Sequence, residues 1–545
     1  MRKGVKAALV GGVFTVMVGG AGYGAYNVVN AVNGGGGSSS GKPGASRSGP
    51  PTRDEVRETA REFLGAWAAG DADGAAAYTD NAEAAAEALT GFREDAYIRK
   101  VELTRGRISG TRVPFTVRAT VTYEGKSKQL RYASALEVVR GVHTGRALVD
   151  WRASVLHPEL KRGDTLETGE AATPPIVAVD RNGVVLTGKK YPSLAPVLDQ
   201  LRAKYGEQAG GRPGVELYVR RAEKGAGAKT LLTFAKGRPG RLPTTLSAAA
   251  QRAAEDAVAR HPESSVVAVR PSSGDVLAVA NHRADKFNAA FEGKLAPGST
   301  MKIVTAAMLI DKGVTKASGP APCTPEATWQ SQTFHNLRGM TPNEDATLAD
   351  SFARSCNTAF VKLVDEKPLT DASLTEEANT NFGLGRDDWR TGITSADGSV
   401  PASGGPDRAA NAIGQGQVQL NPLNLASVTA TAMTGSFRQP VLVPKKFIDG
   451  ELATARGLSA GTVAQLRQMM RRTAVAGTGA RAMAGLGGDV GAKTGSAEVD
   501  GQTKPNSWFA GYRGDTAVAA MAQEGGHGGD TAGPIVAAVL RARGY

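Results

Sequence analysis

The sequence predicts a multidomain α+β protein with a membrane anchor at its N-terminus. Its 545 residues exceed one ordinary domain, and 41% hydrophobic with 21% charged residues is typical of globular protein. Helical and strand periodicity combine in two regions. An amphipathic helix precedes alternating strands after residue 52, and an apolar helix lies between two groups of strands after residue 240.

The first 52 residues predict an anchor and a tether. Residues 1–6 contain three basic side chains, and residues 7–26 carry no charge, which gives about 20 residues or ~30 Å of helix, enough to cross a bilayer. The basic residues keep the N-terminus in the cytoplasm, and a cleaved signal peptide is the alternative. Residues 27–52, rich in Gly, Ser and Pro, form a flexible linker. We therefore expect a single-pass cell-membrane protein whose remaining chain is extracellular.

Residues 53–158 are expected to form a small α+β domain. Its opening helix has one apolar stripe, which consists of Val56, Ala60, Phe63, Leu64 and Trp67. Strands are expected at 113–123, 132–139 and 147–155. Residues 159–240 form the next predicted unit, in which strands at 176–179 and 184–186 flank a tight Asn182-Gly183 turn.

Residues 241–545 form the third predicted domain. Five segments in it have strand character: 265–270, 276–280, 491–498, 506–512 and 517–522. We expect them to share one five-stranded antiparallel sheet flanked by helices, to which both N-terminal and C-terminal strands of the domain contribute. The helix that follows Ser299 would lie in a helical half behind the sheet.

Ser299 and Lys302 are the first candidate functional pair. Positions i and i+3 lie on one helical face, so Ser299 can cap the helix while its hydroxyl meets the Lys302 amine. The apolar run 303–310 predicts a buried helix, and burial lowers the pKa of a lysine. The pattern predicts a nucleophile beside its base. S-x-x-K alone is a weak signal, and a capped core helix is the alternative.

Two further motifs follow in order. Ser355-Cys356-Asn357 begins 56 residues after Ser299, and Lys493-Thr494-Gly495 begins 138 residues after Ser355. S-x-x-K, S-x-N and K-T-G in this order resemble the serine penicillin-recognising enzymes, meaning penicillin-binding proteins and serine β-lactamases. Four other segments are similar to penicillin-binding transpeptidases: 287–291, 414–416, 477–479 and 508–512.

The resemblance also implies a domain plan. Residues 53–158 resemble the cone-shaped, nuclear-transport-factor-like domain of methicillin-resistance-type penicillin-binding proteins. Residues 159–240 would be their linking or dimerisation domain, and 241–545 a transpeptidase domain of β-lactamase-like fold.

The resemblance implies a role for each motif residue. Ser299 would attack the peptide bond between two terminal D-alanines to give an acyl-enzyme, and neutral Lys302 would take its proton. Ser355 would carry a proton to the leaving amine, and Asn357 would bind the substrate backbone. Lys493 would lower the proton affinity of Lys302 and, together with Thr494, would bind the terminal carboxylate of the substrate. Gly495 and Ser496 would also contact the substrate. The backbone N–H groups of Ser299 and Ser496 would form the oxyanion hole.

Within this superfamily the sequence favours a class B, monofunctional peptidoglycan D,D-transpeptidase. The extra domains and the anchor suit work on the cell wall, and no E-x-x-L-N lies between Asn357 and Lys493; Glu376-Glu377-Ala378-Asn379 is nearest. Without that carboxylate, water should attack the acyl-enzyme slowly. The alternatives are a D,D-carboxypeptidase, a β-lactamase-like hydrolase, and a non-catalytic division scaffold or β-lactam sensor.

The expected partners follow from this activity. They are donor stem peptides ending in D-Ala-D-Ala, acceptor stem peptides, β-lactams, the membrane, and a glycosyltransferase of the elongation or division machinery. A net charge of +13 suits an anionic wall polymer or membrane surface, and no nucleic-acid-binding motif is present. No metal or cofactor is expected, because neither C-x-x-C nor H-E-x-x-H occurs.

The two cysteines raise a separate question. Cys356 occupies the variable position of S-x-N, but a nucleophilic role is disfavoured because Ser299 fills it and no histidine is adjacent. In an exported chain, Cys323 and Cys356 can instead pair as a disulfide. The sequence leaves open whether Cys323 and Cys356 form a disulfide or remain free thiols.

Overall fold

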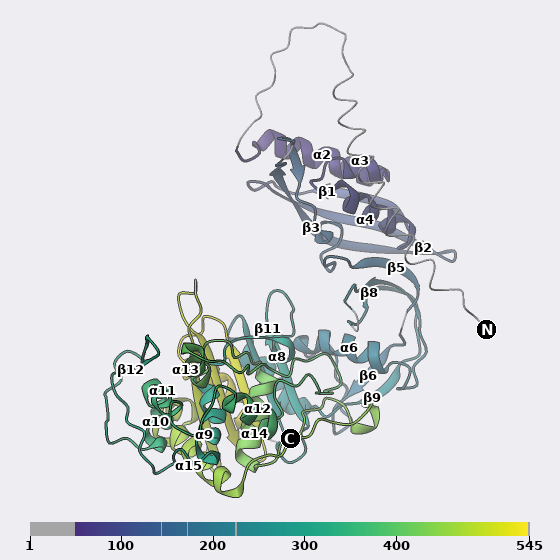
Figure 1. The fold of residues 1–545 in the computed structure, drawn as a ribbon. Coiled ribbons are helices and arrows are strands. Elements are labelled where there is room, and N and C mark those ends of the chain that lie inside the picture. The colour runs from purple at the N-terminus through teal and green to yellow at the C-terminus, as the bar shows by residue number, and fades with distance from the viewer. Residues whose placement is uncertain (1–48, 143, 172, 224–225, 543–545) are drawn as a thin grey trace, which may run out of the picture.

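The computed structural model describes residues 49–142, 144–171, 173–223 and 226–542. The predicted anchor at 7–26 and most of the predicted linker lie outside the described residues. Among the described residues, none of the helices combines the length and the apolar character needed to span a bilayer. Figure 1 shows an N-terminal domain at one end, a connecting region, and a larger C-terminal body.

The N-terminal domain packs three helices on a four-stranded antiparallel sheet. The helices are α2 (Arg53–Ala69), α3 (Ala72–Ala76) and α4 (Ala82–Glu94). The strands, in spatial order, are β1 (Ile98–Arg105), β2 (Arg112–Tyr123), β3 (Lys126–Arg140) and β4 (Ala147–Val149). Thr52 begins α2 in a capping box with Glu55, and the predicted apolar stripe of α2 is buried.

The strand expected over 147–155 is wrong beyond Val149. The Trp151 N–H donates to Asp80 Oδ1 at 2.8 Å, which turns the chain away from the sheet. Residues Ala153–Leu156 then form the short helix α5.

The connecting region contains a three-stranded antiparallel sheet and a two-stranded parallel pair. The three strands are β5 (Thr165–Glu170), β7 (Val215–Arg220) and β8 (Lys229–Ala235), and the pair is β6 (Ile176–Val179) with β9 (Gly240–Pro243). Helices η1 (Pro192–Leu194) and α6 (Ala195–Tyr205) lie between β6 and β7 in the sequence. The expected turn at 182–183 is present, and the segment after it contacts β6 through one bridge, between Val179 and Val185, and through the Leu186 N–H, which donates to the Ala178 carbonyl at 2.9 Å. β6 also pairs with β9 on its other edge.

The buried apolar side chains of this region divide between its neighbours. Leu166, Leu217 and Val219 belong to the core of the N-terminal domain, whereas Leu201 and Tyr205 belong to the core of the C-terminal body. The region therefore packs against both neighbours, and its predicted boundaries at 159 and 240 remain a prediction.

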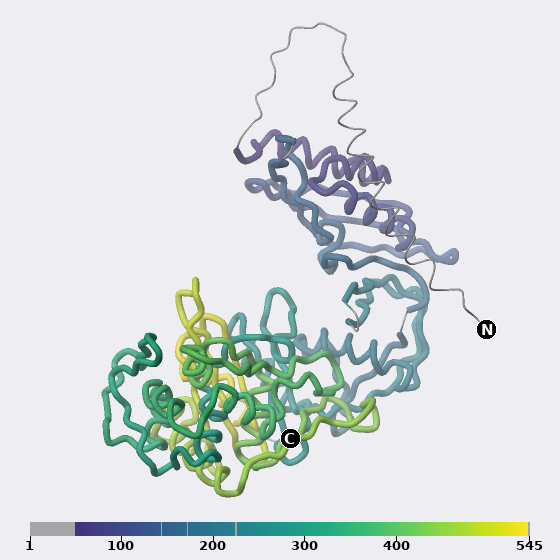
Figure 2. The backbone as a smooth tube through the Cα atoms, in the orientation of Figure 1, coloured from purple at the N-terminus to yellow at the C-terminus, as the bar shows by residue number. Residues whose placement is uncertain are grey.

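The C-terminal body is built on a five-stranded antiparallel sheet of order β11-β10-β16-β15-β14. Its strands are β10 (Ser264–Val269), β11 (Val276–His282), β14 (Val490–Ala497), β15 (Asn506–Arg513) and β16 (Ala517–Ala522). β10 pairs with β16, so teal and yellow segments from opposite ends of this domain run side by side in Figure 2. β14 is an edge strand, which leaves one side of the K-T-G motif open for other partners.

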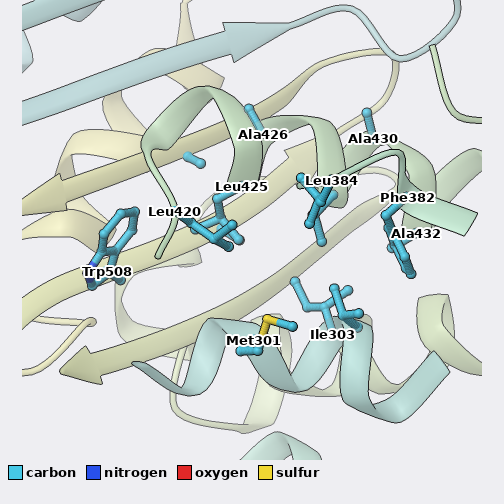
Figure 3. Packing of buried hydrophobic residues seen from close by; sticks show 14 of the residues in the cluster. Met301, Ile303, Phe382, Leu384, Leu420, Leu425, Ala426, Ala430, Ala432 and Trp508 are labelled. Carbon is cyan, nitrogen blue, oxygen red and sulfur yellow. The ribbon is translucent and has the colours of Figure 1, made fainter. Parts of the chain in front are cut away.

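Alternating side chains of the sheet enter two cores. Val266, Ala268 and Phe509 pack in a cluster with α7 (Ala248–Val258) and α17 (Ala532–Arg541). Val267 and Trp508 point to the other face and join the largest cluster, which includes the helix after Ser299. Figure 3 shows part of this cluster, with Met301 and Ile303 facing Leu384 and Leu425.

The helical half contains the remaining elements. They are α8 (Ala289–Glu292), η2 (Gly298–Met301), α9 (Lys302–Asp311), β12 (Glu326–Trp329), β13 (Gln332–His335), α10 (Leu348–Arg354), α11 (Asn357–Leu363), α12 (Ser373–Phe382), α13 (Pro406–Ala412), α14 (Pro422–Thr434), η3 (Lys445–Phe447), α15 (Ala460–Ala476) and α16 (Ala480–Met483). Eight of the ten residues of α9 are buried, as its apolar sequence predicts.

The expected N-cap role of Ser299 is wrong. Ser299 lies inside η2, a 3₁₀ turn, and α9 begins only at Lys302. Gly298 has φ of +54° and donates its N–H to the Gly414 carbonyl, which starts the tighter turn. Side chains at i and i+3 eclipse one another in a 3₁₀ helix, so this turn brings Ser299 and Lys302 together directly.

Candidate active site

Ser299 and Lys302 are in contact. Ser299 Oγ lies 2.9 Å from Lys302 Nζ, and Ser299 is half-buried while Lys302 is completely buried. Lys302 Nζ also donates to the Ser355 carbonyl at 2.9 Å and to Asn357 Oδ1 at 2.6 Å. A neutral amine has two N–H groups and one lone pair. With both N–H groups donated, the lone pair remains for the Ser299 proton.

The S-C-N motif forms the turn between α10 and α11. Ser355 ends α10 in the left-handed conformation, with φ of +64°, and this places its carbonyl on Lys302. Asn357 begins α11, and its Nδ2 donates to the His335 carbonyl at 2.9 Å. The strained backbone at Ser355 is the geometry that lets one residue contact both lysines.

The K-T-G motif lies on β14. Lys493 Nζ donates to Ser355 Oγ at 2.8 Å and to the Thr494 carbonyl at 2.9 Å. An ammonium has three donors, so one remains for a ligand, and the Ser355 hydroxyl keeps its own proton to donate. Ser355 thus contacts both lysines, since its carbonyl accepts from Lys302 and its hydroxyl accepts from Lys493.

Burial and mutual repulsion set the charge of the two lysines. Burial, and then the charge of Lys493, hold the pKa of Lys302 well below its ordinary value. Burial also lowers the pKa of Lys493 to about 7. Each lysine nitrogen faces an aromatic ring, because Lys302 Nζ lies 5.3 Å from the Phe360 ring centre and Lys493 Nζ 5.5 Å from that of Phe352. Lys302 is therefore the member of the pair suited to be neutral.

The backbone near Ser299 packs tightly on β14. A Cβ added to Gly298 would lie 2.5 Å from the Ser496 carbonyl oxygen and 2.9 Å from the Ser496 nitrogen. A Cβ on Gly495 would lie 2.7 Å from the Pro297 carbonyl oxygen. These approaches place the turn that carries Ser299 against the strand that carries Ser496, which is the arrangement expected for two converging N–H donors.

Four neighbours of the site were not identified as functional from the sequence. Thr478 Oγ1 lies 2.7 Å from Thr494 Oγ1, and His527 Nδ1 lies 3.4 Å from Ser496 Oγ. Gln415 Nε2 donates to the Ser496 carbonyl at 3.5 Å. Asn336 contacts the S-C-N turn through its side-chain amide. Gln415 and Thr478 lie in the segments 414–416 and 477–479, whose sequences are similar to penicillin-binding transpeptidases. No sequence pattern marks His527 or Asn336 as part of the site.

The two cysteines are joined in a disulfide with Cα atoms 6.0 Å apart. This bond excludes a nucleophilic role for Cys356 in the oxidised protein, because a disulfide sulfur has no thiolate. Among the described residues, no cluster of three or more His, Cys, Asp or Glu side chains is arranged to hold a metal ion.

Comparison with known proteins defines the family. Residues 264–541 match the penicillin binding protein transpeptidase domain, and residues 55–164 match the NTF2-like N-terminal transpeptidase domain. The chain therefore belongs to the penicillin-binding protein transpeptidase family. Within that family it has the methicillin-resistance-type plan, with an NTF2-like domain before the transpeptidase domain.

Curated relatives agree with this assignment. The peptidoglycan D,D-transpeptidase PbpA of Mycolicibacterium smegmatis is 30% identical over 372 residues, which cover 56% of this chain and 73% of the relative. The protein of the same description from Mycobacterium tuberculosis strain H37Rv is 27% identical over 366 residues, which cover 56% and 72%.

Solved structures show the same fold. A chain of a peptidoglycan synthase complex superposes with a TM-score of 0.53 at 20% identity, over 72% of this chain and 94% of its own. Pseudomonas aeruginosa PBP2, solved with WCK 5153, gives 0.52 at 21% identity, over 67% and 96%.

Proposed function

We propose that this protein is a class B penicillin-binding D,D-transpeptidase that cross-links peptidoglycan stem peptides through an acyl-enzyme on Ser299. One observation carries the proposal: Lys302 contacts the Ser299 hydroxyl, and Ser355 holds Lys302 through its carbonyl and Lys493 through its hydroxyl, with both lysines completely buried. A structural serine–lysine pair does not need a second buried lysine, since burying two ionisable amines side by side is costly and such arrangements gather at functional sites.

Acylation follows from this geometry. Ser299 Oγ loses its proton to the free lone pair of Lys302 and attacks the carbonyl carbon of the penultimate D-alanine. The N–H groups of Ser299 and Ser496 receive the oxyanion. Ser355 Oγ donates its proton to the leaving amine of the terminal D-alanine and takes one from the Lys493 ammonium hydrogen-bonded to it, so that Lys302 gains a proton as Lys493 loses one. The C–N bond breaks and an ester to Ser299 remains.

Substrate binding uses the open side of β14. The third N–H of Lys493 and the Thr494 hydroxyl are available to the terminal carboxylate, and Thr478 holds Thr494 in place. Asn357 is already bonded to Lys302 and to His335 on its two amide atoms. Its Nδ2 carries a second N–H that can donate to the substrate backbone while Oδ1 continues to hold Lys302.

The second half-reaction requires the amine of another stem peptide. Glu377, the nearest sequence candidate for a deacylating carboxylate, accepts a hydrogen bond from Asn381 at 2.8 Å and faces Asp311. Asn381 lies in α12 together with Glu377, and Asp311 is the last residue of α9, so Glu377 lies at the end of α9 that is remote from Ser299. This placement supports attack by an amine acceptor, with water as a poor one, and a long-lived adduct with β-lactams.

We also propose that the protein is anchored in the cell membrane by residues 7–26 and works outside the cell. The Cys323–Cys356 disulfide supports an oxidising location. The net charge of +13 supports contact with an anionic wall or membrane surface. A glycosyltransferase that supplies the glycan strands is the expected protein partner, since the synthase complex named above joins polymerisation and crosslinking.

Intact-protein mass spectrometry of residues 53–545 with excess benzylpenicillin tests the proposal. We expect one adduct on the wild-type protein that persists for hours, and none on a Ser299→Ala variant. Loss of the adduct within minutes would favour a β-lactamase. The absence of an adduct on the wild-type protein would refute the proposal and favour a non-catalytic scaffold. Normal growth of cells that carry Ser299→Ala would favour the same alternative.

A second assay separates the two possible acceptors. A thioester or peptide donor ending in D-Ala is incubated with and without a D-amino acid. Transfer to the amine that exceeds hydrolysis is the expected result. Hydrolysis that the amine does not reduce would identify a D,D-carboxypeptidase instead.

A further inference from the structure

The S-C-N turn is capped from another part of the chain. The first N–H groups of α11 need an acceptor, as at every helix N-terminus. The residue at the N-cap position, Cys356, makes no capping hydrogen bond with its side chain. Asn336 supplies the acceptor, because its Oδ1 receives the N–H of Asn357 at 2.7 Å and that of Thr358 at 3.2 Å.

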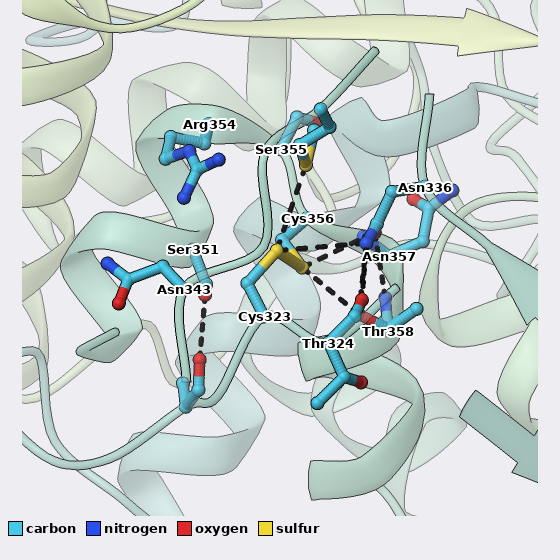
Figure 4. Close-up of a disulfide and its surroundings, with 12 residues drawn as sticks. Cys323, Thr324, Asn336, Asn343, Ser351, Arg354, Ser355, Cys356, Asn357 and Thr358 are labelled. Carbon is cyan, nitrogen blue, oxygen red and sulfur yellow. Dashed lines mark hydrogen bonds between the residues drawn. A yellow bond between two sulfur atoms is a disulfide. The ribbon is translucent and has the colours of Figure 1, made fainter. Parts of the chain in front are cut away.

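Asn336 is itself held firmly. Its Nδ2 donates to the Thr324 carbonyl at 2.8 Å and to Thr358 Oγ1 at 3.2 Å, and Thr358 Oγ1 in turn donates to the same carbonyl at 2.8 Å. Figure 4 shows Asn336 beside the disulfide and the start of α11. Both atoms of the Asn336 amide are thus used, and the orientation of this side chain is determined.

The disulfide ties the same segment to the same turn. Cys356 is the middle residue of the motif, and its partner Cys323 exchanges two backbone hydrogen bonds of 2.8 Å with Asn343. A third link is the bond from Asn357 Nδ2 to the His335 carbonyl. The segment 323–336, which contains the β12–β13 hairpin, therefore contacts the turn at three successive positions.

These contacts matter because the turn is strained where it meets the lysines. Ser355 has φ of +64°, which a residue with a side chain adopts only when its surroundings require it. Its carbonyl and hydroxyl contact Lys302 and Lys493, respectively. If the start of α11 were released, Asn357 Oδ1 and the Ser355 carbonyl would leave the Lys302 amine together.

We infer that Asn336 is a positioning residue for acylation, which acts by capping α11 and so fixes Asn357 and Ser355 against Lys302. Its own hydrogen bonds go to the start of α11 and to the Thr324 carbonyl, and it acts on the lysines only through the turn. The disulfide is the second restraint on the same turn. The inference deepens the proposed function and rests on it.

The test compares three variants of residues 53–545 in saturation kinetics of acylation by a fluorescent penicillin. Asn336→Ala removes the cap and should lower the limiting acylation rate constant about 10- to 100-fold, with little change in the half-saturating concentration. Asn343→Ala is the matched control. Asn343 Oδ1 accepts the Asp345 N–H at 3.1 Å, a hydrogen bond that stays within its own loop and away from the start of α11.

The Asn336→Asp variant distinguishes a positioning role of Asn336 in acylation from a general contribution to protein stability. Its carboxylate still accepts both N–H groups of α11, although it loses the Nδ2 bond to the Thr324 carbonyl, and it brings a negative charge near the turn, whose contacting ionisable groups are Lys302 and Lys493. We expect it to recover most of the lost rate at high pH. The acid limb of its pH–rate profile should lie at higher pH than in the wild type, because the added charge favours protonated Lys302.

Thermal unfolding of all variants accompanies the kinetics. If the wild-type protein acylates but Asn336→Ala stays within threefold of Asn343→Ala, this inference alone is overturned. An Asn336→Asp variant with the rate loss of Asn336→Ala at every pH would also overturn it. Wild-type protein that forms no adduct would instead overturn the proposed function.

Discussion

The contact between Gly298 and Ser496 leads to a sharp prediction. Gly298→Ala puts a methyl group 2.5 Å from the Ser496 carbonyl oxygen, on a residue whose φ is +54°. The obstacle is the backbone of β14, which is paired with β15 in the five-stranded sheet, and not a side chain that could rotate away. The contact must open by about 0.9 Å to reach 3.4 Å, where ordinary van der Waals contact begins.

Two costs add in this variant. An alanine in the left-handed region costs about 1 to 2 kcal/mol. Forcing an extra carbon into a packed site costs about 1 to 3 kcal/mol more. We therefore expect the free energy of unfolding to fall by about 2 to 5 kcal/mol. Because Ser299 follows Gly298, the nucleophile moves relative to the Ser496 N–H, and a displacement near 1 Å should slow acylation about 100-fold.

Gly313→Ala is the matched control. Gly313 follows α9 with φ of +71°, and a Cβ there would meet no atom within 4 Å. It should lose about 1 to 2 kcal/mol of stability and no acylation rate. Chemical denaturation and acylation by a fluorescent penicillin measure both quantities. A Gly298→Ala variant that acylates within threefold of Gly313→Ala would refute the idea that this approach positions the nucleophile.

Three further predictions concern charges and the disulfide. Reduction of Cys323–Cys356 should lower the free energy of unfolding by about 3 to 4 kcal/mol, and an unchanged denaturation midpoint with reductant would contradict this. Lys493→Gln should move the acid limb of acylation to higher pH, because Lys302 keeps its burial but loses the second cation that lowers its pKa; identical limbs in both proteins would count against it. Burial raises the pKa of Glu377 from 4.5 to about 7, so its ionisation destabilises the fold progressively as pH rises between those values. Glu377→Gln should therefore stabilise the protein at pH 8 by up to about 3 kcal/mol and much less at pH 5, as denaturation at both pH values would test.

Much of the catalytic assignment could be predicted from local sequence. The spacing of Ser299 and Lys302, the apolar run after them, and the order of the three motifs are properties of short segments. Segments 265–270, 276–280 and 517–522 are largely apolar over five or six residues, and a pattern of that kind can be recognised without knowing which strand is the partner. The 3₁₀ turn at Ser299 was missed because it depends on Gly298 contacting Gly414, which is remote in sequence.

The tertiary structure alone decided how these segments meet. It placed β10 between β11 and β16, and it left β14 at the edge beside the turn that carries Ser299. It also brought Asn336 to the start of α11, where no sequence pattern marks it. The physical reason is the range of the interactions involved. Helical spacing and strand alternation arise between near neighbours, whereas strand order and a cap from a distant segment depend on how both faces of the sheet are packed.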